Sequence, residues 1–346
     1  MLAGMEMTAG QPVGGDPGRR RMLRRLCMPA IGAALVALWL PAGGGGAAGL
    51  PNGEIVFARS AEVNSSTGAW VTADLYVMAP DGTRLRLLAR NAAQPAVSPD
   101  ARRIAFVRGF AIWVMNRDGS GQKQLTSPVR RKVSWGWDHD SDSAPAWSQD
   151  GKTLYFSRWS NTTYTGPLYA VTIADGRVRQ LTYPAPSEHG HCQDNPALSP
   201  NGRTLAYDET LDCEHGWFTH ISAITTTGQR TTLPFRFPRL SVVSEAAWAP
   251  GGNRLAYAVQ GDSDSAIGGS GVYISAANGS PPERIAASFV SAPAWSADGR
   301  SIVYATYVGS NDDRDIWLTR TDGTGGTPLT QTRADDTDPA WLPAAH

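Results

Sequence analysis

The sequence predicts an all-β fold, a six-bladed β-propeller built from four-stranded antiparallel blades. The main observation is a motif, Pro145-Ala-Trp-Ser-Gln-Asp-Gly151, which is followed by alternating apolar residues in Lys152–Arg158. Similar segments recur at intervals of about 46 to 51 residues, a period typical of solenoids and propellers. They begin at Pro95, Pro196, Ala247, Pro293 and Pro339.

Each repeat contains the pattern of two β-hairpins. In the Ser-Pro-Asp-Gly turn, proline and aspartate take the central positions, and glycine follows where a positive φ is needed. The strand after the turn alternates apolar and polar residues, as at Leu154 and Phe156. A second hairpin follows, for example at residues 111–116 and 122–126. Four antiparallel strands per repeat, A to D, make one propeller blade.

The two ends of the repeat region are incomplete in complementary ways. Gly53–Arg59 has the pattern of a strand B without its strand A, and Pro339–Trp341 has that of a strand A without its strand B. We expect these two strands to pair and to close the ring, which leaves no free sheet edge between the first and last blades. The tryptophans that recur at one position of strand A are expected to pack between blades: Trp147, Trp248, Trp295 and Trp341.

These repeats resemble those of a known family. The pattern Pro-Ala-Trp-Ser-Pro-Asp-Gly-Arg-x-Ile-Ala-Phe, followed by Ile-Trp-Val-Met-Asn-x-Asp-Gly and Gln-Leu-Thr, is similar to the WD40-like (PD40) repeat of TolB-like six-bladed β-propellers. The resemblance implies a cell-envelope protein that engages protein partners through its channel mouth. TolB has an α/β domain before its propeller, whereas we expect this chain to pass from an export segment directly to the first blade. We therefore assign no role in the Tol–Pal envelope system.

Residues 1–49 are predicted to lie outside the propeller, which we place at residues 50–346. The first 18 residues are rich in glycine and proline and are expected to be disordered. Arg19–Arg25 form a basic segment, Leu26–Leu40 an apolar one that is short for a membrane span, and Pro41–Gly49 supply small residues for cleavage. This pattern predicts a signal peptide and a secreted, periplasmic or cell-surface protein. A twin-arginine signal and an uncleaved anchor, the one route to a membrane, remain open.

Composition argues against several other functions. The chain has 31 basic and 31 acidic residues, with no basic cluster outside the N-terminus, so we expect no nucleic-acid partner. It contains no Gly-x-Ser-x-Gly elbow, and no Walker or Rossmann glycine pattern before a helix, so we predict no catalytic residues. We expect a monomer without a cofactor.

The two faces of the predicted propeller differ in the length of their connections. The A–B and C–D turns on one face, the turn face, are short and rich in glycine. The B–C loops and D–A connections on the other face, the loop face, include long segments at 127–144, at 183–195 and in the fourth blade. Because loops on a rigid scaffold often carry binding groups, we expect a protein or glycan partner here. The candidate residues are Trp135, Trp137, Asp138, His139, Asp140, His189, His191, Asp194, His215 and Trp217.

Other interpretations of these residues stay open. The aromatic side chains would simply pack against their own loops. A transition metal would suit imidazole ligands, with Gln193 or Asp194 beside them, and would indicate a metal-dependent carbohydrate-active enzyme similar to propeller-type pectate-fragment lyases. Calcium would suit Asp138–Asp142, although Ser143 and Gln149 stand where an EF-hand needs glycine and glutamate. The candidate metal ligands are His139, His189, His191 and His215.

Cys192 and Cys213 would both lie on the loop face of the fourth blade. An even number of cysteines in an exported chain predicts a disulfide, with two free thiols or a metal pair as the alternatives. Charged residues also end several strands. Arg59, Arg108 and Arg158 end strand B in three blades, and Asp335, Asp336 and Asp338 flank the closing strand. These side chains would line the channel mouth, or else be solvated strand ends and turn caps.

Overall fold

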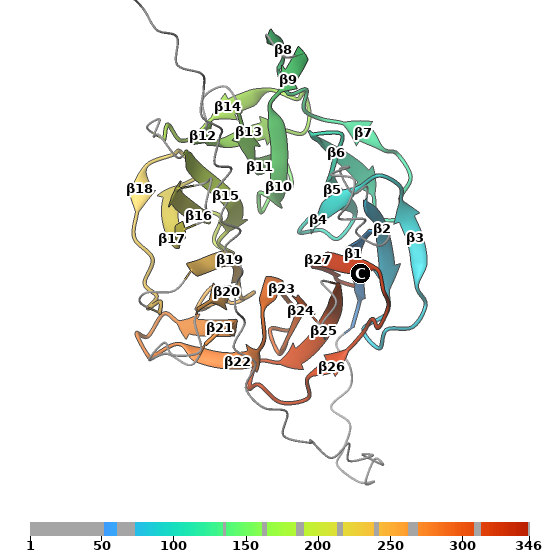
Figure 1. The fold of residues 1–346 in the computed structure, drawn as a ribbon, viewed down its shortest axis with the longest axis vertical. Helices are drawn as coiled ribbons and strands as arrows, with labels where there is room; N and C mark the ends of the chain where they lie inside the picture. Colours follow the sequence, from blue (N-terminus) through green and yellow to red (C-terminus); the bar gives the residue numbers. More distant parts are fainter. Residues whose placement is uncertain are drawn as a thin grey trace, which may run out of the picture. The chain divides into compact units, whose positions relative to one another are not determined.

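The computed structural model describes residues 52–60, 73–133, 136–160, 165–184, 190–212, 217–238, 242–261, 269–307 and 313–344. The side chains of residues 133–138 and 212–218 are not described. Six sheets, each with four antiparallel strands, are arranged in a ring as the blades of a propeller (Figure 1). The predicted all-β, six-bladed fold is therefore confirmed. The described residues form no helix long and apolar enough to cross a membrane.

The first three blades follow one another along the chain. Blade 1 contains β27 (Asp335–Leu342), β1 (Glu54–Ser60), β2 (Ala73–Met78) and β3 (Arg86–Ala89). Blade 2 contains β4 (Ala93–Val97), β5 (Arg103–Arg108), β6 (Ala111–Asn116) and β7 (Lys123–Gln124). Blade 3 contains β10 (Ser141–Trp147), β11 (Thr153–Trp159), β13 (Leu168–Thr172) and β14 (Val178–Gln180).

The last three blades complete the ring. Blade 4 contains β15 (His191–Leu198), β16 (Thr204–Asp212), β17 (Trp217–Thr225) and β18 (Arg230–Thr231). Blade 5 contains β19 (Val242–Trp248), β20 (Arg254–Gln260), β21 (Gly271–Ala276) and β22 (Glu283–Ala287). Blade 6 contains β23 (Val290–Trp295), β24 (Ser301–Tyr307), β25 (Arg314–Arg320) and β26 (Thr327–Pro328).

Two additions occur on the loop face near blades 3 and 4. The connection into blade 3 forms a separate hairpin of β8 (Arg130–Val133) and β9 (Gly136–His139), at the rim of the ring in Figure 1. A short strand after β11, β12 (Thr165–Gly166), pairs in parallel with β15 and makes blade 4 five-stranded. Part of the segment predicted to be loop is therefore regular strand.

The two ends of the repeat region close the ring as predicted. β27 pairs antiparallel with β1, with Ile55 opposite Trp341 and Arg59 opposite Asp336. The innermost strand of blade 1 is therefore β27, from the end of the repeat region, and the next strand is β1, from its beginning. Closure of this kind removes the two sheet edges that an open ring would expose.

Strand A of every blade contains a β-bulge at the same position. In blade 3 the register shifts between Ser143 and Ala146, and equivalent shifts occur in the other five blades. Proline follows the first bulge residue in five blades, where its missing N–H interrupts no ladder bond. The first bulge residue has a positive φ of 49° to 57° in each blade: Gln94, Ala144, Asn195, Glu245, Ala292 and Asp338. The bulge thus re-aims one side chain per blade.

The apolar core lies between neighbouring blades. One buried cluster, for example, joins Ile55 and Phe57 of blade 1 to Val303 and Ile316 of blade 6. Three of the recurrent tryptophans also bond across the blade boundary through their indole N–H. The acceptors are carbonyls of the preceding strand A, at 2.9 Å for Trp147 to Ala96, 3.1 Å for Trp248 to Ala197 and 2.9 Å for Trp295 to Ala247. These tryptophans therefore pack between blades, as predicted.

Candidate functional site

The last residues of strand B carry ion pairs in blades 1 and 3. Arg59 donates two hydrogen bonds to Asp336, at 2.6 and 2.7 Å, and Arg158 donates two to Asp142, at 2.5 and 2.8 Å. Each guanidinium also lies over aromatic rings of its own blade, 5.0 to 5.5 Å from their centroids. Arg108 of blade 2 instead donates to the carbonyl oxygens of Arg90 and Asn91. Two of the three arginines are thus neutralised within their own blades.

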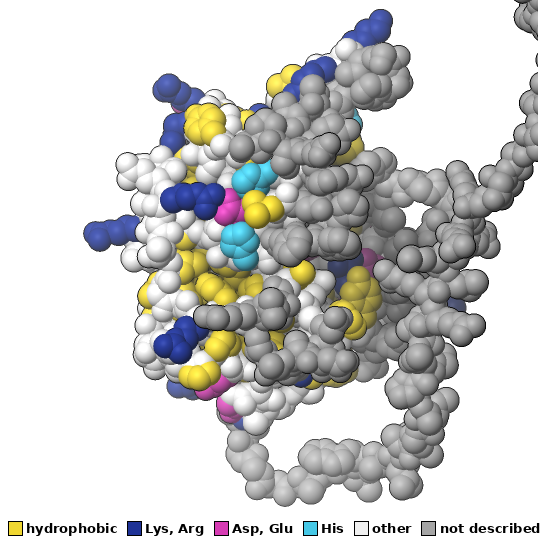
Figure 2. Space-filling model, turned by 60° about the vertical axis from the view of Figure 1, so that its left-hand side comes forward, with side chains coloured by type: hydrophobic (Ala, Val, Ile, Leu, Met, Phe, Trp, Pro, Cys, Tyr) yellow, Lys and Arg dark blue, Asp and Glu magenta, His cyan; other side chains and the backbone are white. Residues whose placement is uncertain are grey.

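Blade 4 reverses the charge at this position, where Glu209 lies opposite Gln193 of strand A. The Glu209 carboxylate is buried and pairs with Arg230 of strand D. It also accepts hydrogen bonds from Ser222 at 2.7 Å and from Gln193 at 3.3 Å. Two histidine nitrogens lie close to it, those of His191 at 3.2 Å and of His220 at 3.5 Å. Figure 2 shows histidine side chains grouped with acidic and basic ones on one side of the molecule.

The donors around Glu209 decide its protonation state. Burial raises the pKa of Glu209, but hydrogen bonds from His220, Arg230 and Ser222 outweigh burial and hold the pKa well below its ordinary value. The carboxylate therefore stays ionised at physiological pH. Arg230 and His220 are largely exposed, so the cluster links a buried charge to the protein surface.

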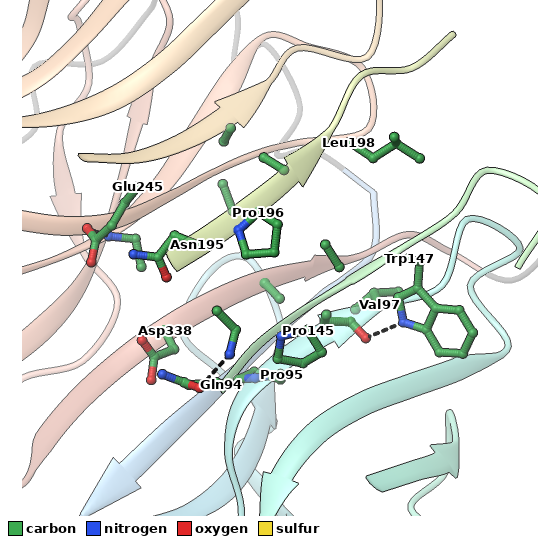
Figure 3. Close-up of a pocket in the computed structure, with 18 of the residues that line it drawn as sticks. Gln94, Pro95, Val97, Pro145, Trp147, Asn195, Pro196, Leu198, Glu245 and Asp338 are labelled. Carbon is green, nitrogen blue, oxygen red and sulfur yellow. Dashed lines mark hydrogen bonds between the residues drawn. The ribbon is translucent and has the colours of Figure 1, made fainter. Parts of the chain in front are cut away.

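The innermost strands surround a channel cavity of about 420 Å³. Its wall repeats proline and alanine from blade to blade, whereas the first bulge residue varies. Figure 3 shows the polar ends of Gln94, Asn195, Glu245 and Asp338 at one end of the cavity, away from Trp147. Strand A starts at the loop face, and the bulge comes before the Trp position. The polar end of the channel therefore faces the loop face.

Side chains and backbone amides of successive bulges are hydrogen-bonded around this ring. The amide of Ala144 donates to Gln94 Oε1 at 2.9 Å (Figure 3), and the amide of Ala292 donates to Glu245 at 2.6 Å. The amide of Glu245 donates to Asp208 at 2.9 Å, and that of Gln94 donates to Asp338. In these four blades, a side chain of the preceding blade thus satisfies the bulge amide and fixes the polar groups in place, whereas the amide of Asn195 donates to Asp194 of its own strand.

The carboxyl groups at this end of the channel resist ionisation. Burial raises the pKa of Glu245 to about 7 and also raises the pKa of Asp338. Burial raises the pKa of Asp208 well above its ordinary value, although Asn195 Nδ2 donates to it at 2.8 Å. No lysine or arginine occurs among the described residues that line the cavity. This end of the channel is therefore acidic. Arg314, which is not part of the lining, lowers the pKa values of Glu245 and Asp338, but burial outweighs its effect.

Several predicted site residues lie in strands rather than loops. His191 and Asp194 belong to β15, because the bulge at Asn195 lets strand A pair with β16 on both sides of it. Trp137, Asp138 and His139 are in β9, and Trp217 begins β17. Trp135, His189 and His215 lie outside the described residues, and the side chains of Trp137, Asp138 and Trp217 are likewise not described.

The candidates whose side chains are described already have structural partners. The His139 ring packs on Phe110 with ring centroids 3.9 Å apart, and its Nδ1 is buried without a partner among the described residues. Asp140 pairs with Arg131 at 2.7 Å. Asp194 accepts a hydrogen bond from Ser143 at 3.3 Å. These contacts show that each of the three side chains helps to hold the fold together. Their role in binding stays a prediction.

The metal predictions are likewise untested. Within the described ranges, no group of three or more histidine, cysteine, aspartate or glutamate side chains is placed to hold a metal ion. Two carboxylates of the proposed calcium segment, Asp140 and Asp142, are each paired with an arginine. Calcium would have to compete with these ion pairs. His189 and His215 lie outside the described residues.

Cys192 is disulfide-bonded in the structure. Its expected partner, Cys213, lies outside the described residues. The pairing of these two cysteines is therefore still a prediction. Cys192 lies in β15 between β12 and β16, opposite Gly166 on one side and Thr210 on the other.

The fold is shared with known propellers. TolB from Acinetobacter baumannii matches with a TM-score of 0.64 and 20% sequence identity, over 86% of this chain and 68% of that chain. A chain from a nidogen/laminin complex matches with a TM-score of 0.59 and 8% identity, over 84% and 98%. An oligogalacturonate lyase from Vibrio parahaemolyticus matches with a TM-score of 0.50 and 12% identity, over 75% and 71%. No protein-family model and no curated protein matches the sequence.

These matches show a TolB-like six-bladed propeller. At such low identities they establish the fold alone, because one fold supports many functions. The functional argument therefore rests on two features of this chain, the Glu209 cluster in blade 4 and the acidic end of the channel. The acidic end of the channel leaves a trace in the sequence, because the residue before Pro-Ala varies from repeat to repeat while the rest of the motif is kept.

Proposed function

We propose that this chain is an extracytoplasmic binding module, without catalytic chemistry of its own, that holds a protein partner against the loop face. The observation that carries the proposal is the acidic end of the channel. Glu245 and Asp338 are partly buried, have raised pKa values and lack a neighbouring lysine or arginine in the channel wall. Buried carboxyl groups of this kind destabilise the folded protein. Their presence in the channel therefore favours a role in binding over a role in stability.

Other features support a protein partner at this face. The bulge residues are fixed by hydrogen bonds around the ring, so a partner would meet a preorganised surface. One matching propeller chain comes from a complex of nidogen and laminin, and another is TolB. An extracytoplasmic location fits the TolB-like fold and the predicted export segment in residues 1–49.

Site-specific cross-linking tests this proposal. p-Benzoylphenylalanine would replace either Tyr183, an exposed residue on the loop face, or Leu85, an exposed residue in a turn of the opposite face. In cells that express the full chain, we expect a discrete cross-linked protein from position 183 and none from position 85. The partner would be identified by mass spectrometry, purified and titrated. Because Glu245→Gln with Asp338→Asn removes both ionisable carboxyl groups of the channel, we expect this variant to bind about tenfold more weakly.

Two results would contradict the proposal. Cross-links that arise equally from both faces would show that the loop face has no special role. An identified partner whose affinity is unchanged by the channel variant would exclude the acidic end of the channel from the interface. A surface variant, Asp322→Asn on the turn face, serves as the matched control because its carboxylate bonds only within its own turn.

A metal-dependent carbohydrate-active enzyme is not favoured. His191 is hydrogen-bonded to Glu209, His139 packs on Phe110, and the match to the oligogalacturonate lyase concerns the fold. Elemental analysis of protein purified without chelator distinguishes the two functions. A stoichiometric transition metal that disappears in a His191→Ala/His215→Ala variant would overturn the non-catalytic proposal.

A further inference from the structure

A small cleft lies between blades 3 and 4, beside the polar end of the channel. Its volume is about 280 Å³. Blade 3 contributes Ser143, Ser157 and Trp159 to its lining, and blade 4 contributes Gly166 and Asp194. Ser143 and Asp194 precede the bulge in strand A, Ser157 and Trp159 lie near the end of strand B, and Gly166 belongs to β12, so the cleft lies in the loop-face half of the blades. Pockets for drug-sized ligands span roughly 300 to 1,000 Å³, so this cleft suits a smaller molecule.

The Ser157 hydroxyl is the unusual group in this cleft. Ser157 is only 3% exposed, and its Oγ has no hydrogen-bond partner among the described residues. Leaving a buried hydroxyl unpaired is unfavourable, and native structures seldom do so. Ser157 lines the cleft, so a polar group of a bound molecule would supply the missing partner.

Comparison among the blades shows that strand B does not require a hydroxyl here. Ser157 pairs with Ser143 of strand A, and the equivalent strand B residues are identified by the same pairing. Four of them are apolar: Ala58, Val107, Ala258 and Ala305. The fifth, Asp208, is polar but receives hydrogen bonds from Asn195 and from the amide of Glu245. Ser157 is therefore a departure from the repeat that the fold itself does not explain.

The other groups of the cleft define the chemistry of its ligand. Ser143 Oγ donates to Asp194 Oδ1 at 3.3 Å, and this Oδ1 also accepts the amide of Asn195 at 2.9 Å. Hydroxyls both donate and accept, whereas a carboxylate only accepts, so the site suits a molecule with several hydroxyl groups. Trp159 adds a flat apolar surface beside these polar groups. An aromatic face together with a few polar groups fits a sugar ring, whose C–H face is apolar and whose rim is polar.

We propose that this cleft is a subsite for one neutral sugar residue of a glycan. The proposal goes beyond the binding of a protein partner and does not depend on it. Asp194 would accept hydrogen bonds from sugar hydroxyls, Ser157 would bond to a hydroxyl at the cleft floor, and the ring would lie on Trp159. No lysine or arginine is among the described residues of the lining, and Arg158 is paired with Asp142. Uronic acids and sugar phosphates would therefore be disfavoured.

Binding of simple glycosides to the full chain tests the proposal. The probes are the methyl glycosides of glucose, galactose, mannose and N-acetylglucosamine, with galacturonic acid as the charged comparison. Saturation-transfer difference NMR detects contact, and chemical-shift titration of the tryptophan indole signals measures affinity. We expect at least one neutral glycoside to bind saturably, with galacturonic acid much weaker.

Two variants locate the binding. Ser157→Ala introduces the residue that three other blades carry, so the fold should be retained, while loss of one hydrogen bond should weaken binding about tenfold. Trp159→Leu should abolish the saturation transfer, because the stacking surface is lost. The matched control is Ser291→Ala, because Ser291 occupies the Ser143 position in blade 6, opposite Ala305. This control should bind as tightly as the unaltered protein. Thermal unfolding verifies that each variant is folded.

Several results would overturn the proposal. If no neutral glycoside binds saturably, the cleft holds solvent only. If galacturonic acid binds as tightly, the site does not select neutral sugars. If Ser157→Ala has the same affinity as Ser291→Ala, binding occurs elsewhere. If the indole signals shift only when a protein partner found by cross-linking is added, and not with any glycoside, the cleft belongs to a protein interface.

Discussion

Glu209 in blade 4 and Glu245 in blade 5 are glutamates of neighbouring blades with opposite properties. Glu209 is surrounded by donors from three strands, β15, β17 and β18, and its pKa is held well below the ordinary value despite burial. Among the described residues, the amide of Ala292 is the donor to Glu245, and burial raises the pKa of Glu245 to about 7. The first carboxylate is balanced by its surroundings and is structural. The Glu245 carboxylate lacks such stabilising donors, which is why the acidic end of the channel is the stronger candidate for function.

The largest loss of stability is expected where a carboxylate is paired with a buried cation that cannot become solvated when the carboxylate is removed. Asp336 is such a carboxylate, because the side chain of Arg59 is only 16% exposed and lies over Phe57 and Tyr76. Asp336→Ala would leave this guanidinium buried and unpaired, so we expect a loss of about 3 to 5 kcal/mol in the free energy of unfolding. Urea denaturation measures this loss. The double variant Asp336→Ala/Arg59→Met should recover most of the stability, and failure to do so would show that the ion pair is not the cause.

An intermediate effect, of opposite sign, is expected at Glu245. Its folded-state pKa of about 7 lies above the ordinary value of 4.5, so the folded protein binds the extra proton between these two pH values. Stability contributed by this group is therefore present at low pH and falls as the pH rises from about 4.5 to 7, by up to about 3 kcal/mol. Glu245→Gln removes this dependence and should make the protein more stable than the unaltered chain at pH 8.

Denaturant unfolding at pH 5 and pH 8 checks this prediction. The control is Glu54→Gln, because the Glu54 side chain is 27% exposed and is paired with Arg86 and Arg117. An equal pH dependence in the Glu245→Gln variant and the unaltered protein would contradict the view that Glu245 is unbalanced.

The smallest effect is expected at Arg230, the exposed partner of Glu209. Its side chain is 66% exposed, and Gln193, Ser222 and His191 would still contact the carboxylate in Arg230→Ala. We expect a loss of about 1 kcal/mol at pH 7. The depressed pKa of Glu209 gives stability that is present above its unfolded pKa and is lost as the pH falls through the folded value. Loss of Arg230 raises that folded pKa, so acid unfolding monitored by circular dichroism should begin at a higher pH.

The repeats were sufficient to predict the blades and their closure. Their turn residues and alternating strands have local physical causes, such as the bonds that Ser148 and the amide of Lys152 donate to Asp150 within one turn. The closing pair was predictable because Gly53–Arg59 and Pro339–Trp341 each lacked a partner. The bulge was not predicted, because a residue before proline normally favours an extended conformation, whereas Gln94 and Asp338 adopt a positive φ.

The candidate site was harder to predict, for a different reason. The histidines of residues 183–195 made this segment a candidate site. However, His191 contacts Glu209, and this contact follows from the strand register that places Glu209 opposite Gln193. Likewise, the pKa of Glu245 follows from burial in a channel that six blades build together. Sequence order shows which residues are present, but these properties arise from contacts between distant strands.

The pairing of β27 with β1 also has a consequence for synthesis. Arg59 and Asp336, which meet in that pair, are separated by 277 positions in the chain. The inner edge of β1 therefore leaves the ribosome long before the strand that will cover it, and during that time it can pair with another chain. A polypeptide that lost β27 would keep five complete blades and one permanently open edge. Within the described propeller, the strand made last is the one that protects the strand made first.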